Sequence, residues 1–512
     1  MNFRVAVGCA LGAGGLAVLG LPSGPAPVAL MIGLMILLIL LPRFSARQGA
    51  WIGFAFGLSH FSFGFSWILT SLHQYGGISW PVSLLMLLGF AAGMALYPAL
   101  FGALLTLLAP RHTLLPLAAP ALWVTTEWLR AHLLGGFAWN LAGYGWDPWL
   151  PMLQTADLGG VFLLSWLMLL PASVGATLWL ERPTGRTMAL GIGSVVLLLG
   201  AAFWYGDWRI TTLQAEQKLD NRPPLRVAIV QGNIPQQLKW ATSQQKETLD
   251  RYLHLTRSLP RPVDIVVWPE TAMSFFFRAN PDYLKQISQL SREIAAPILT
   301  GTPSIDRENE AEPWRYYNSM VMLDEAGSLE QRYDKHHLVP FGEFIPLRQW
   351  LPTTLNKFTE GTEDFSSGPG PVPLAWSKGN IGPLICYEAI FPDEVRALAN
   401  TGVQWLVNIT NDAWFGNSAK PQHLAMVRLR AVENRLPMIR SANTGISAVF
   451  DASGRELDRT APDQTSTLVV TLPHGRGESP YRRYGGVWIG LWIGLLALSW
   501  LLGQRTGNPP TA

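Results

Sequence analysis

The chain has 512 residues, of which 49% are hydrophobic and only 14% charged, with a formal net charge of +3. This balance excludes an ordinary soluble protein and predicts a membrane protein with a soluble part. The first lysine is Lys218, so the sequence offers no polybasic face, and we expect no nucleic-acid partner.

Apolar runs follow one another from Met1 to about residue 206, each near the roughly 20 residues that cross a bilayer core. They predict a membrane domain over residues 1–206 with seven transmembrane helices, and a final transmembrane helix over 486–503. The eight predicted spans are 4–21, 25–42, 50–71, 80–109, 114–134, 158–180, 187–205 and 486–503.

The arginines predict the orientation, because cytoplasmic loops are enriched in Lys and Arg. If the N-terminus is cytoplasmic, most of these arginines lie at the cytoplasmic ends of the predicted spans. Arg130 and the pair Arg482-Arg483 lie on the other side and weaken the bias. Both termini are then cytoplasmic, and a domain over residues 222–475 faces the periplasm of a bacterial inner membrane. The arginines on the predicted inner side are Arg43, Arg47, Arg111, Arg182, Arg186 and Arg505.

Near the end of the fifth span, Glu127 is a costly intramembrane charge, and we expect it to pair with Arg130. The loop that follows, 135–147, combines aromatic residues with glycines. It is either an interfacial aromatic belt or a substrate-gripping loop.

Beyond Pro223-Pro224 the pattern changes to short β-rich runs that alternate with helical stretches, which is typical of an α/β layered domain. No glycine-rich phosphate loop appears, and His336-His337 is a lone adjacent pair, so we expect no nucleotide cofactor and no metal. The predicted strands are Leu225–Gln231, Val263–Trp268, Ala296–Gly301, Ser319–Asp324, Asn380–Ile385, Gln404–Asn411, Gly445–Asp451 and Thr467–Leu472. The predicted helices are 243–258, 281–294, 392–400 and 421–436, the last opened by Pro421.

Cys386 stands where a predicted strand meets the helix start Pro392-Asp393-Glu394, so its sulfur is expected on a sharp strand-to-helix turn. The other cysteine, Cys9, lies in the apolar N-terminal segment, which makes Cys386 a free thiol. A lone cysteine is ordinarily an inert small hydrophobe. Two ionisable residues upstream change that interpretation.

Glu270 follows Val266-Val267-Trp268-Pro269, and Lys335 follows Tyr333-Asp334, so each stands at or just beyond a strand end. A cysteine nucleophile needs a carboxylate to take the thiol proton and a cation that lowers the thiol pKa and holds an oxyanion. Glu270, Lys335 and Cys386 together supply these groups.

The ordered motifs Trp-Pro-Glu, Lys-x-His-Leu-x-Pro-Phe-Gly-Glu and Cys-Tyr-Glu resemble those of the nitrilase superfamily. With seven spans before the domain and one after it, the whole chain is similar to the apolipoprotein N-acyltransferase family, the membrane-embedded branch. The resemblance extends to 230–235, Lys239-Trp240 and 408–416. It implies an αββα sandwich that moves an acyl chain from a phospholipid to the α-amine of the diacylglyceryl-cysteine of an apolipoprotein.

Carried over to this sequence, the resemblance implies that Glu270 is the general base, Lys335 the oxyanion-stabilising cation and Cys386 the nucleophile that becomes a thioester. It also implies supporting roles for four further residues, each of which could instead have a purely structural role. Glu343 would orient Lys335 or the incoming amine, or form a buried structural ion pair. Trp240 would line the acyl groove, and Tyr387 and Glu388 would shape the nucleophile turn, or all three would serve packing.

Two apolar segments are candidate lipid contacts. The stretch between Glu343 and Pro373 is long, rich in Pro, Gly, Ser and Thr, and interspersed with apolar residues, which favours a lid on the bilayer. The segment 273–277 is a second candidate, or else a buried loop core.

Three functions remain in competition: a membrane acyltransferase, a membrane-anchored amidase that uses water as acceptor, and a catalytically silent scaffold. Eight spans disfavour the amidase, because one anchor would tether it, and the intact triad disfavours the scaffold. The expected partners are a phospholipid acyl donor and an apolipoprotein acceptor, and the expected state is a monomer.

Overall fold

The computed structural model describes residues 1–22, 24, 26–108, 111–307, 310, 312–346, 364–475 and 478–504. The chain divides into two compact units. A helical unit is formed by residues 1–69, 80–212 and those from 479 on, and a catalytic unit by residues 70–79 and 213–478.

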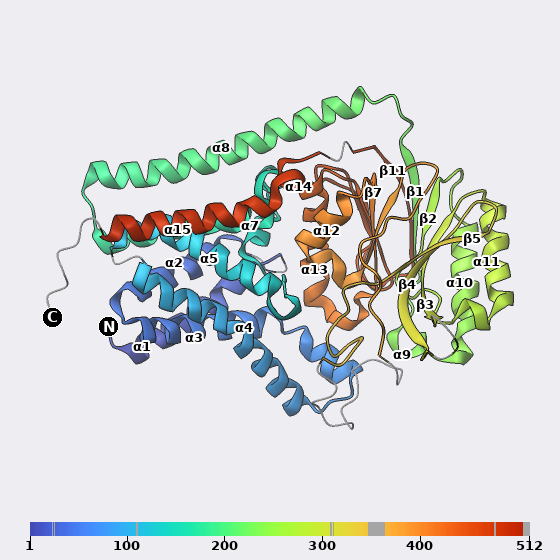
Figure 1. The fold of residues 1–512 in the computed structure, drawn as a ribbon, viewed down its shortest axis with the longest axis horizontal. Helices are drawn as coiled ribbons and strands as arrows, with labels where there is room; N and C mark the ends of the chain where they lie inside the picture. The colour runs from blue at the N-terminus through green and yellow to red at the C-terminus, as the bar shows by residue number, and fades with distance from the viewer. Residues whose placement is uncertain are drawn as a thin grey trace. The chain divides into compact units, whose positions relative to one another are not determined.

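Helices make up the helical unit, and each of the eight predicted spans falls on one of them (Figure 1). Glycines bring neighbouring helices into close contact: a side chain at Gly14 would collide with the carbonyl of Phe56, and one at Gly53 with that of Pro98. The helices are α1 (Phe3–Val18), α2 (Val28–Leu40), α3 (Ala46–Gly64), α4 (Trp80–Leu108), α5 (Leu115–His132), α6 (Leu150–Leu153), α7 (Ala156–Glu181), α8 (Gly185–Lys218), α14 (Pro480–Tyr484) and α15 (Trp488–Gln504).

Within the described residues, four helical stretches are long and apolar enough to cross a membrane: α4, α7, α8 and the continuous stretch Pro480–Gln504. Two others are apolar but short, since α1 has 16 residues and α2 has 13, fewer than the roughly 20 that a bilayer core requires. The region is therefore helical and contains stretches that fit a membrane protein, whereas the total of eight spans stays a prediction.

Glu127 and Arg130 interact electrostatically, as expected, and each also contacts the loop that follows. Glu127 Oε1 accepts hydrogen bonds from the indole of Trp123 at 2.9 Å and from the N–H of Ala142 at 2.7 Å. Arg130 Nη1 donates to the carbonyl of Trp139 at 2.7 Å. Both charges thus fix the loop 135–147, whose Trp139 is fully buried and so cannot belong to an interfacial belt.

The catalytic unit contains two sheets. The larger has six strands in the order β11-β1-β2-β3-β4-β5, and the smaller has five in the order β10-β9-β8-β7-β6. β1, β2 and β3 run parallel, as do β6, β7 and β8, and the other pairs are antiparallel. The strands are β1 (Leu225–Gln231), β2 (Ile265–Val267), β3 (Ile298–Asp306), β4 (Arg315–Leu323), β5 (Leu329–Asp334), β6 (Ile381–Ile385), β7 (Trp405–Thr410), β8 (Met438–Ala442), β9 (Ala448–Phe450), β10 (Glu456–Arg459) and β11 (Ser466–Leu472).

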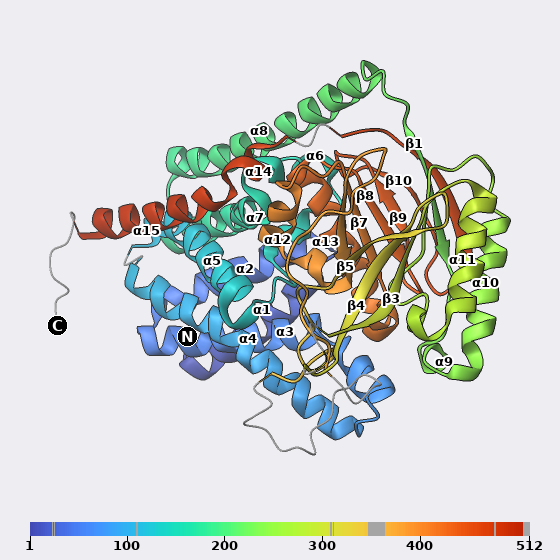
Figure 2. The ribbon, with the colours of Figure 1, turned by 45° about the vertical axis from the view of Figure 1, so that its right-hand side comes forward.

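Two helices cover each sheet, which gives the predicted αββα sandwich (Figures 1 and 2). α10 (Gln245–Arg257) and α11 (Pro281–Ile294) share an apolar core with the six-stranded sheet, whereas α12 (Pro392–Ala399) and α13 (Gly416–Asn434) share one with the five-stranded sheet. Hydrogen bonds also join the sheets, for example from Ser441 Oγ to the carbonyl of Val267 at 3.2 Å. The sandwich core is therefore continuous up to the strand ends that carry the site.

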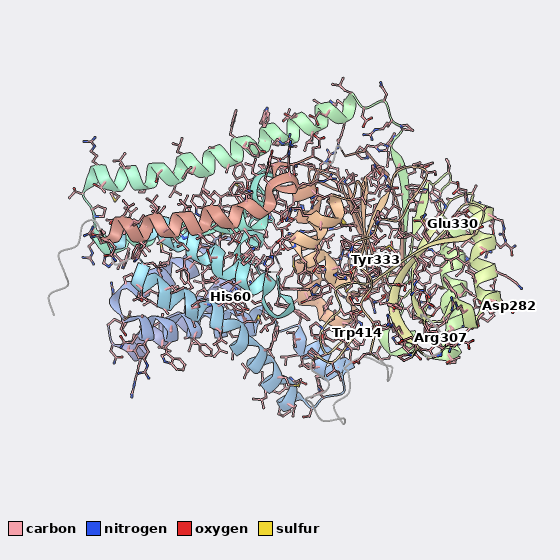
Figure 3. The ribbon with its side chains drawn as sticks, in the orientation of Figure 1. His60, Asp282, Arg307, Glu330, Tyr333 and Trp414 are labelled. Carbon is pink, nitrogen blue, oxygen red and sulfur yellow. The ribbon has the colours of Figure 1, made fainter. Side chains whose placement is uncertain are left out.

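Every predicted strand is present, but three strands are additional: β5, β8 and β10. α13 begins at Gly416, so Pro421 lies inside that helix rather than at its start. A π-helical segment, Thr70–Tyr75, also belongs to the catalytic unit although α3 and α4 flank it in sequence. Its Ser71 Oγ donates to the carbonyl of Trp414 at 2.5 Å (Trp414 is labelled in Figure 3).

Candidate active site

Glu270 stands three residues beyond the end of β2 and is 7% exposed. Its Oε1 accepts a hydrogen bond from Asn318 Nδ2 at 2.7 Å, and its Oε2 accepts one from the backbone N–H of Asn411 at 2.8 Å. One partner comes from each sheet, so the packing of the two sheets fixes the carboxylate.

Lys335 directly follows β5 and is 1% exposed. Its Nζ donates to Glu343 Oε1 at 2.9 Å and lies 3.9 Å from Glu270 Oε1. Burial alone would lower the pKa of Lys335, but the two carboxylates outweigh it and raise the pKa above its usual value. Lys335 therefore stays positively charged at any working pH.

Glu343 belongs to the same cluster, as the sequence predicted. Its Oε1 also accepts from Asn318 Nδ2 at 2.9 Å, and its Oε2 accepts from the N–H of Val339 at 2.8 Å. Asn318 thus bridges the two carboxylates and holds them on either side of Lys335. Glu343 thus forms a buried ion pair with Lys335.

Cys386 follows β6 at the predicted turn into α12 and is 5% exposed. Burial raises the pKa of its thiol, and the Glu270 charge raises it further, against the opposing effects of Lys335 and a hydrogen bond with Thr410. The resting thiol is therefore protonated. An attack by its sulfur requires a base to remove the proton, and Glu270 is the carboxylate that acts on it most strongly.

Each of the three active-site segments contains a strained backbone residue. Thr271, Phe341 and Cys386 have φ of 43°, 61° and 52°, in the left-handed region that residues with a Cβ rarely adopt. Such conformations cost on the order of 1–3 kcal/mol each and persist only where surrounding contacts impose them. The sandwich holds these turns in shape.

Glu388 and Tyr387 form the far side of the nucleophile turn. The buried Glu388 Oε1 accepts from the hydroxyl of Tyr333 at 2.7 Å and the N–H of His336 at 2.7 Å, and Oε2 accepts from the N–H of Ile385 at 2.6 Å (Tyr333 is labelled in Figure 3). Glu388 therefore ties the segment after Lys335 to the turn that presents Cys386. The ring of Tyr387 packs edge-on against Phe391, with centroids 4.9 Å apart.

Trp240 is half-buried and directly follows the short helix α9 (Gln236–Lys239). The preceding residue, Lys239, contacts the site. Lys239 is 3% exposed, and its Nζ donates to the main-chain carbonyl of Glu270 at 2.9 Å. Burial lowers the pKa of Lys239 to about 8. Lys239 was not assigned to the site from the sequence, although Lys239-Trp240 is among the motifs that carry the resemblance.

Asn318 and Asn411 were also missed as site residues. Asn318 lies in β4 among residues with ordinary strand propensity, so no local pattern marked it. Asn411 follows β7, and its position at a strand end was the available signal; its Nδ2 donates to Gln236 Oε1 at 2.6 Å.

The two candidate lipid segments have different outcomes. Met273, Phe275 and Phe277 are buried in the core beneath the six-stranded sheet, so the loop-core interpretation holds for them. The proposed lid lies largely at 347–363, outside the described residues.

A carboxylate, a permanent cation and a strained, protonated thiol thus meet at the strand ends of an αββα sandwich. This arrangement suits acyl transfer through a cysteine, with the carboxylate moving protons and the cation receiving a developing oxyanion. It defines the class as a cysteine-dependent enzyme of the nitrilase type.

Matches to protein-family models agree with this class. Residues 226–480 match the carbon-nitrogen hydrolase family, and residues 13–174 match the apolipoprotein N-acyltransferase N-terminal domain. An amidase of the nitrilase superfamily from Nesterenkonia AN1, with a solved structure, is 19% identical with a TM-score of 0.37, covering 50% of this chain and 92% of its own.

Relatives named apolipoprotein N-acyltransferase match most of the sequence. The one from Geobacter metallireducens is 38% identical over 93% of this chain and 90% of its own length. The one from Pseudomonas aeruginosa is 37% identical over 97% of this chain and 95% of its own. The chain belongs to the apolipoprotein N-acyltransferase family.

Proposed function

We propose that this chain transfers an acyl chain from a membrane phospholipid to the α-amine of the diacylglyceryl-cysteine at the N-terminus of an apolipoprotein. Family membership supports the reaction class. The observation that carries the mechanism is the buried cluster in which Lys335 Nζ lies 2.9 Å from Glu343 and 3.9 Å from Glu270, electrostatically coupled to the Cys386 thiol.

In the first half-reaction Glu270 takes the proton of the Cys386 thiol, and the sulfur attacks the ester carbonyl carbon of the phospholipid. The carbonyl electrons move to the oxygen, where the positive charge of Lys335 stabilises them. As the intermediate collapses, the carbon–oxygen bond to glycerol breaks and Glu270 returns its proton to the leaving oxygen. A thioester and a lysophospholipid result.

In the second half-reaction the α-amine attacks the thioester carbonyl while Glu270 takes a proton from the nitrogen. The carbon–nitrogen bond forms, the carbon–sulfur bond breaks, and Glu270 returns the proton to the sulfur. Glu343 keeps Lys335 in place through both steps. Tyr387 and Glu388 hold the nucleophile turn, and Trp240 lines the acyl groove.

The proposed setting is a multi-pass protein of the bacterial inner membrane that works as a monomer. Seven helices would span the bilayer within residues 1–206 and an eighth over 486–503, with the catalytic domain 222–475 in the periplasm. The arginine distribution supports this orientation, and the helix at each predicted span supports the number.

The decisive experiment incubates the purified protein with a phospholipid labelled in its acyl chain. We expect a base-labile label on the peptide that contains Cys386, and its transfer to the amine of an added diacylglyceryl-cysteine peptide. The matched control is Cys386→Ala, which keeps Cys9 and should carry no label. Label on Cys386→Ala would overturn the nucleophile assignment, and release as free fatty acid at the same rate with or without acceptor would identify a hydrolase.

Orientation is tested separately with reporter fusions. A periplasm-active reporter fused near residue 300 should be active, and one near residue 45 inactive. The reverse pattern would put the domain in the cytoplasm, away from a lipoprotein substrate.

A further inference from the structure

The backbone carbonyl of Cys386 has two partners that are fully buried side chains behind the nucleophile. Asn408 Nδ2, in β7, donates to it from 3.3 Å, and His423 Nε2, in α13, lies 3.3 Å from it. Cys386 has a φ of 52°, which its side chain disfavours. Contacts on its carbonyl are a direct means of imposing that conformation.

Arg440, in β8, contacts both of these partners. Its Nη1 donates to Asn408 Oδ1 at 2.5 Å, which leaves the amide nitrogen turned toward Cys386, and its Nη2 lies 3.2 Å from His423 Nδ1. The carbonyl oxygen of Cys386 can only accept, so the His423 nitrogen that faces it, Nε2, carries a proton. Arg440 therefore fixes the orientation of the Asn408 amide and lies against the other nitrogen of the His423 ring.

Asp412 balances the charge of Arg440. Its Oδ2 accepts from Arg440 Nη2 at 2.6 Å, and its Oδ1 accepts from Thr410 Oγ1 at 2.9 Å and lies 3.2 Å from His423 Nδ1. Asn408, Asp412, His423 and Arg440 are all 0% exposed. Burial, followed by the charge of Arg440, lowers the pKa of His423, which agrees with a neutral ring.

We propose that these four residues, here called the carbonyl clamp, are positioning residues for acyl transfer. They hold the backbone of Cys386 so that its sulfur stays beside Glu270 and Lys335. They act through the backbone and do not contact the reacting atoms. The inference rests on the proposed role of Cys386 as nucleophile.

The sharpest test compares His423→Gln with His423→Leu, because both side chains are uncharged, like the ring that they replace. Glutamine can still donate to the Cys386 carbonyl, whereas leucine cannot. Two readouts are taken: single-turnover acylation, and the pH midpoint of Cys386 alkylation by iodoacetamide. The charged groups that set this midpoint are Glu270, Lys335, Asp412 and Lys239.

We expect His423→Leu to slow acylation about 10- to 100-fold, the scale of an ångström-sized misplacement. Its alkylation midpoint should move to lower pH, since the sulfur leaves the burial and the Glu270 charge that raise the pKa of its thiol more than Lys335 lowers it. His423→Gln should recover most of both. Wild-type values in a folded His423→Leu, or a glutamine variant as impaired as the leucine variant, would overturn the proposal.

Thr460→Val provides a matched control, because Thr460 Oγ1 donates to Gln231 Oε1 at 2.8 Å in another buried polar cluster of the same unit. It should lower the thermal midpoint of unfolding and leave the alkylation midpoint unchanged. If His423→Leu does not fold, the acylation rate of Asn408→Asp tests the clamp instead. It keeps an oxygen for Arg440 but has no N–H for the Cys386 carbonyl, so it should also slow acylation, and an unchanged rate would overturn the clamp.

Failure of the clamp and failure of the proposed function give different results. Alkylation needs no acyl transfer, so a shifted midpoint in His423→Leu would stand even if Cys386→Ala still transferred acyl chains. Coincident midpoints would refute the clamp while Cys386 remained essential.

Discussion

The two sheets of the catalytic unit contribute unlike chemistry to one site. The six-stranded sheet supplies two charges, that of Glu270 beyond β2 and that of Lys335 after β5. Asn318 of β4 donates hydrogen bonds to the carboxylates of both Glu270 and Glu343. The five-stranded sheet supplies the thiol of Cys386 and, behind it, the carbonyl clamp. In the proposed mechanism, proton movement and oxyanion stabilisation thus belong to one layer, and presentation of the nucleophile to the other.

This division means that a change in either sheet should damage catalysis in a distinguishable way. Removing a charge leaves the thiol correctly presented but changes its ionisation. Loosening the clamp leaves the charges in place but moves the thiol away from them.

The largest effect is expected for Glu270→Gln, which keeps the shape of the side chain but cannot accept a proton. Both half-reactions should slow by roughly 10²–10⁴-fold. The Glu270 charge also raises the pKa of the Cys386 thiol, so its loss should let the thiolate form more readily. Single-turnover acylation between about pH 6 and pH 10 should therefore recover partly as the pH rises.

Lys335→Met should lose roughly 10²–10³-fold, because the oxyanion then lacks its cation. Lys335 lowers the pKa of the thiol, so the variant should need a still higher pH for thiolate formation and recover little by pH 10. The same pH series provides the measurement. Equal recovery in Glu270→Gln and Lys335→Met would contradict the assignment of base and cation.

Asp412→Asn tests the clamp side through stability. Burial would raise the pKa of Asp412, but the charge of Arg440 outweighs it and holds the pKa well below its usual value. The carboxylate therefore stabilises the fold above the unfolded pKa of about 3.9, and this contribution is lost as the pH falls toward the folded pKa. Removing it leaves Arg440 buried and uncompensated, at a cost of about 3–5 kcal/mol.

Denaturant unfolding in detergent between about pH 3 and pH 7 measures this contribution. The wild-type protein should lose more free energy of unfolding on acidification than Asp412→Asn does. Parallel curves for the two proteins would show that the ion pair contributes nothing. Lys246→Ala is the matched control, because Lys246 forms an exposed pair with Asp250, and such pairs contribute about 1 kcal/mol or less.

The sequence predicted the groups whose chemistry is local and missed those that depend on tertiary packing. Glu270, Lys335 and Cys386 each stand at a strand end beside a recognisable motif. The strand before Lys335, β5, was missed because its Leu-Glu-Gln-Arg-Tyr-Asp is that of a polar edge strand, and edge strands tolerate charges. β8 was missed for another reason: it carries the buried Arg440, whose partners become neighbours only after folding.

An α/β layered domain was predictable because strand and helix patterns alternate along the chain, whereas the αββα arrangement followed from the resemblance to the nitrilase superfamily; in the structure each sheet shares an apolar core with its helices. The interaction of Glu127 with Arg130 was predictable because the two residues are three positions apart on one helix. Their hydrogen bonds with the next loop were not predictable, because the loop reaches these side chains only after folding.

The smallest expected effect is that of Cys9→Ala, which removes the only other thiol in the sequence. Cys9 lies in α1 of the helical unit and is exposed, whereas Cys386 is buried in the catalytic unit. Exchanging an exposed cysteine for alanine on a helix removes no packing and no hydrogen bond of consequence, so stability should change by no more than about 0.5 kcal/mol. Acyl transfer and the thermal midpoint should equal those of the wild type. Because the variant carries a single thiol, its alkylation reports on Cys386 alone, and a loss of transfer there would show that nucleophile chemistry is not confined to the five-stranded sheet.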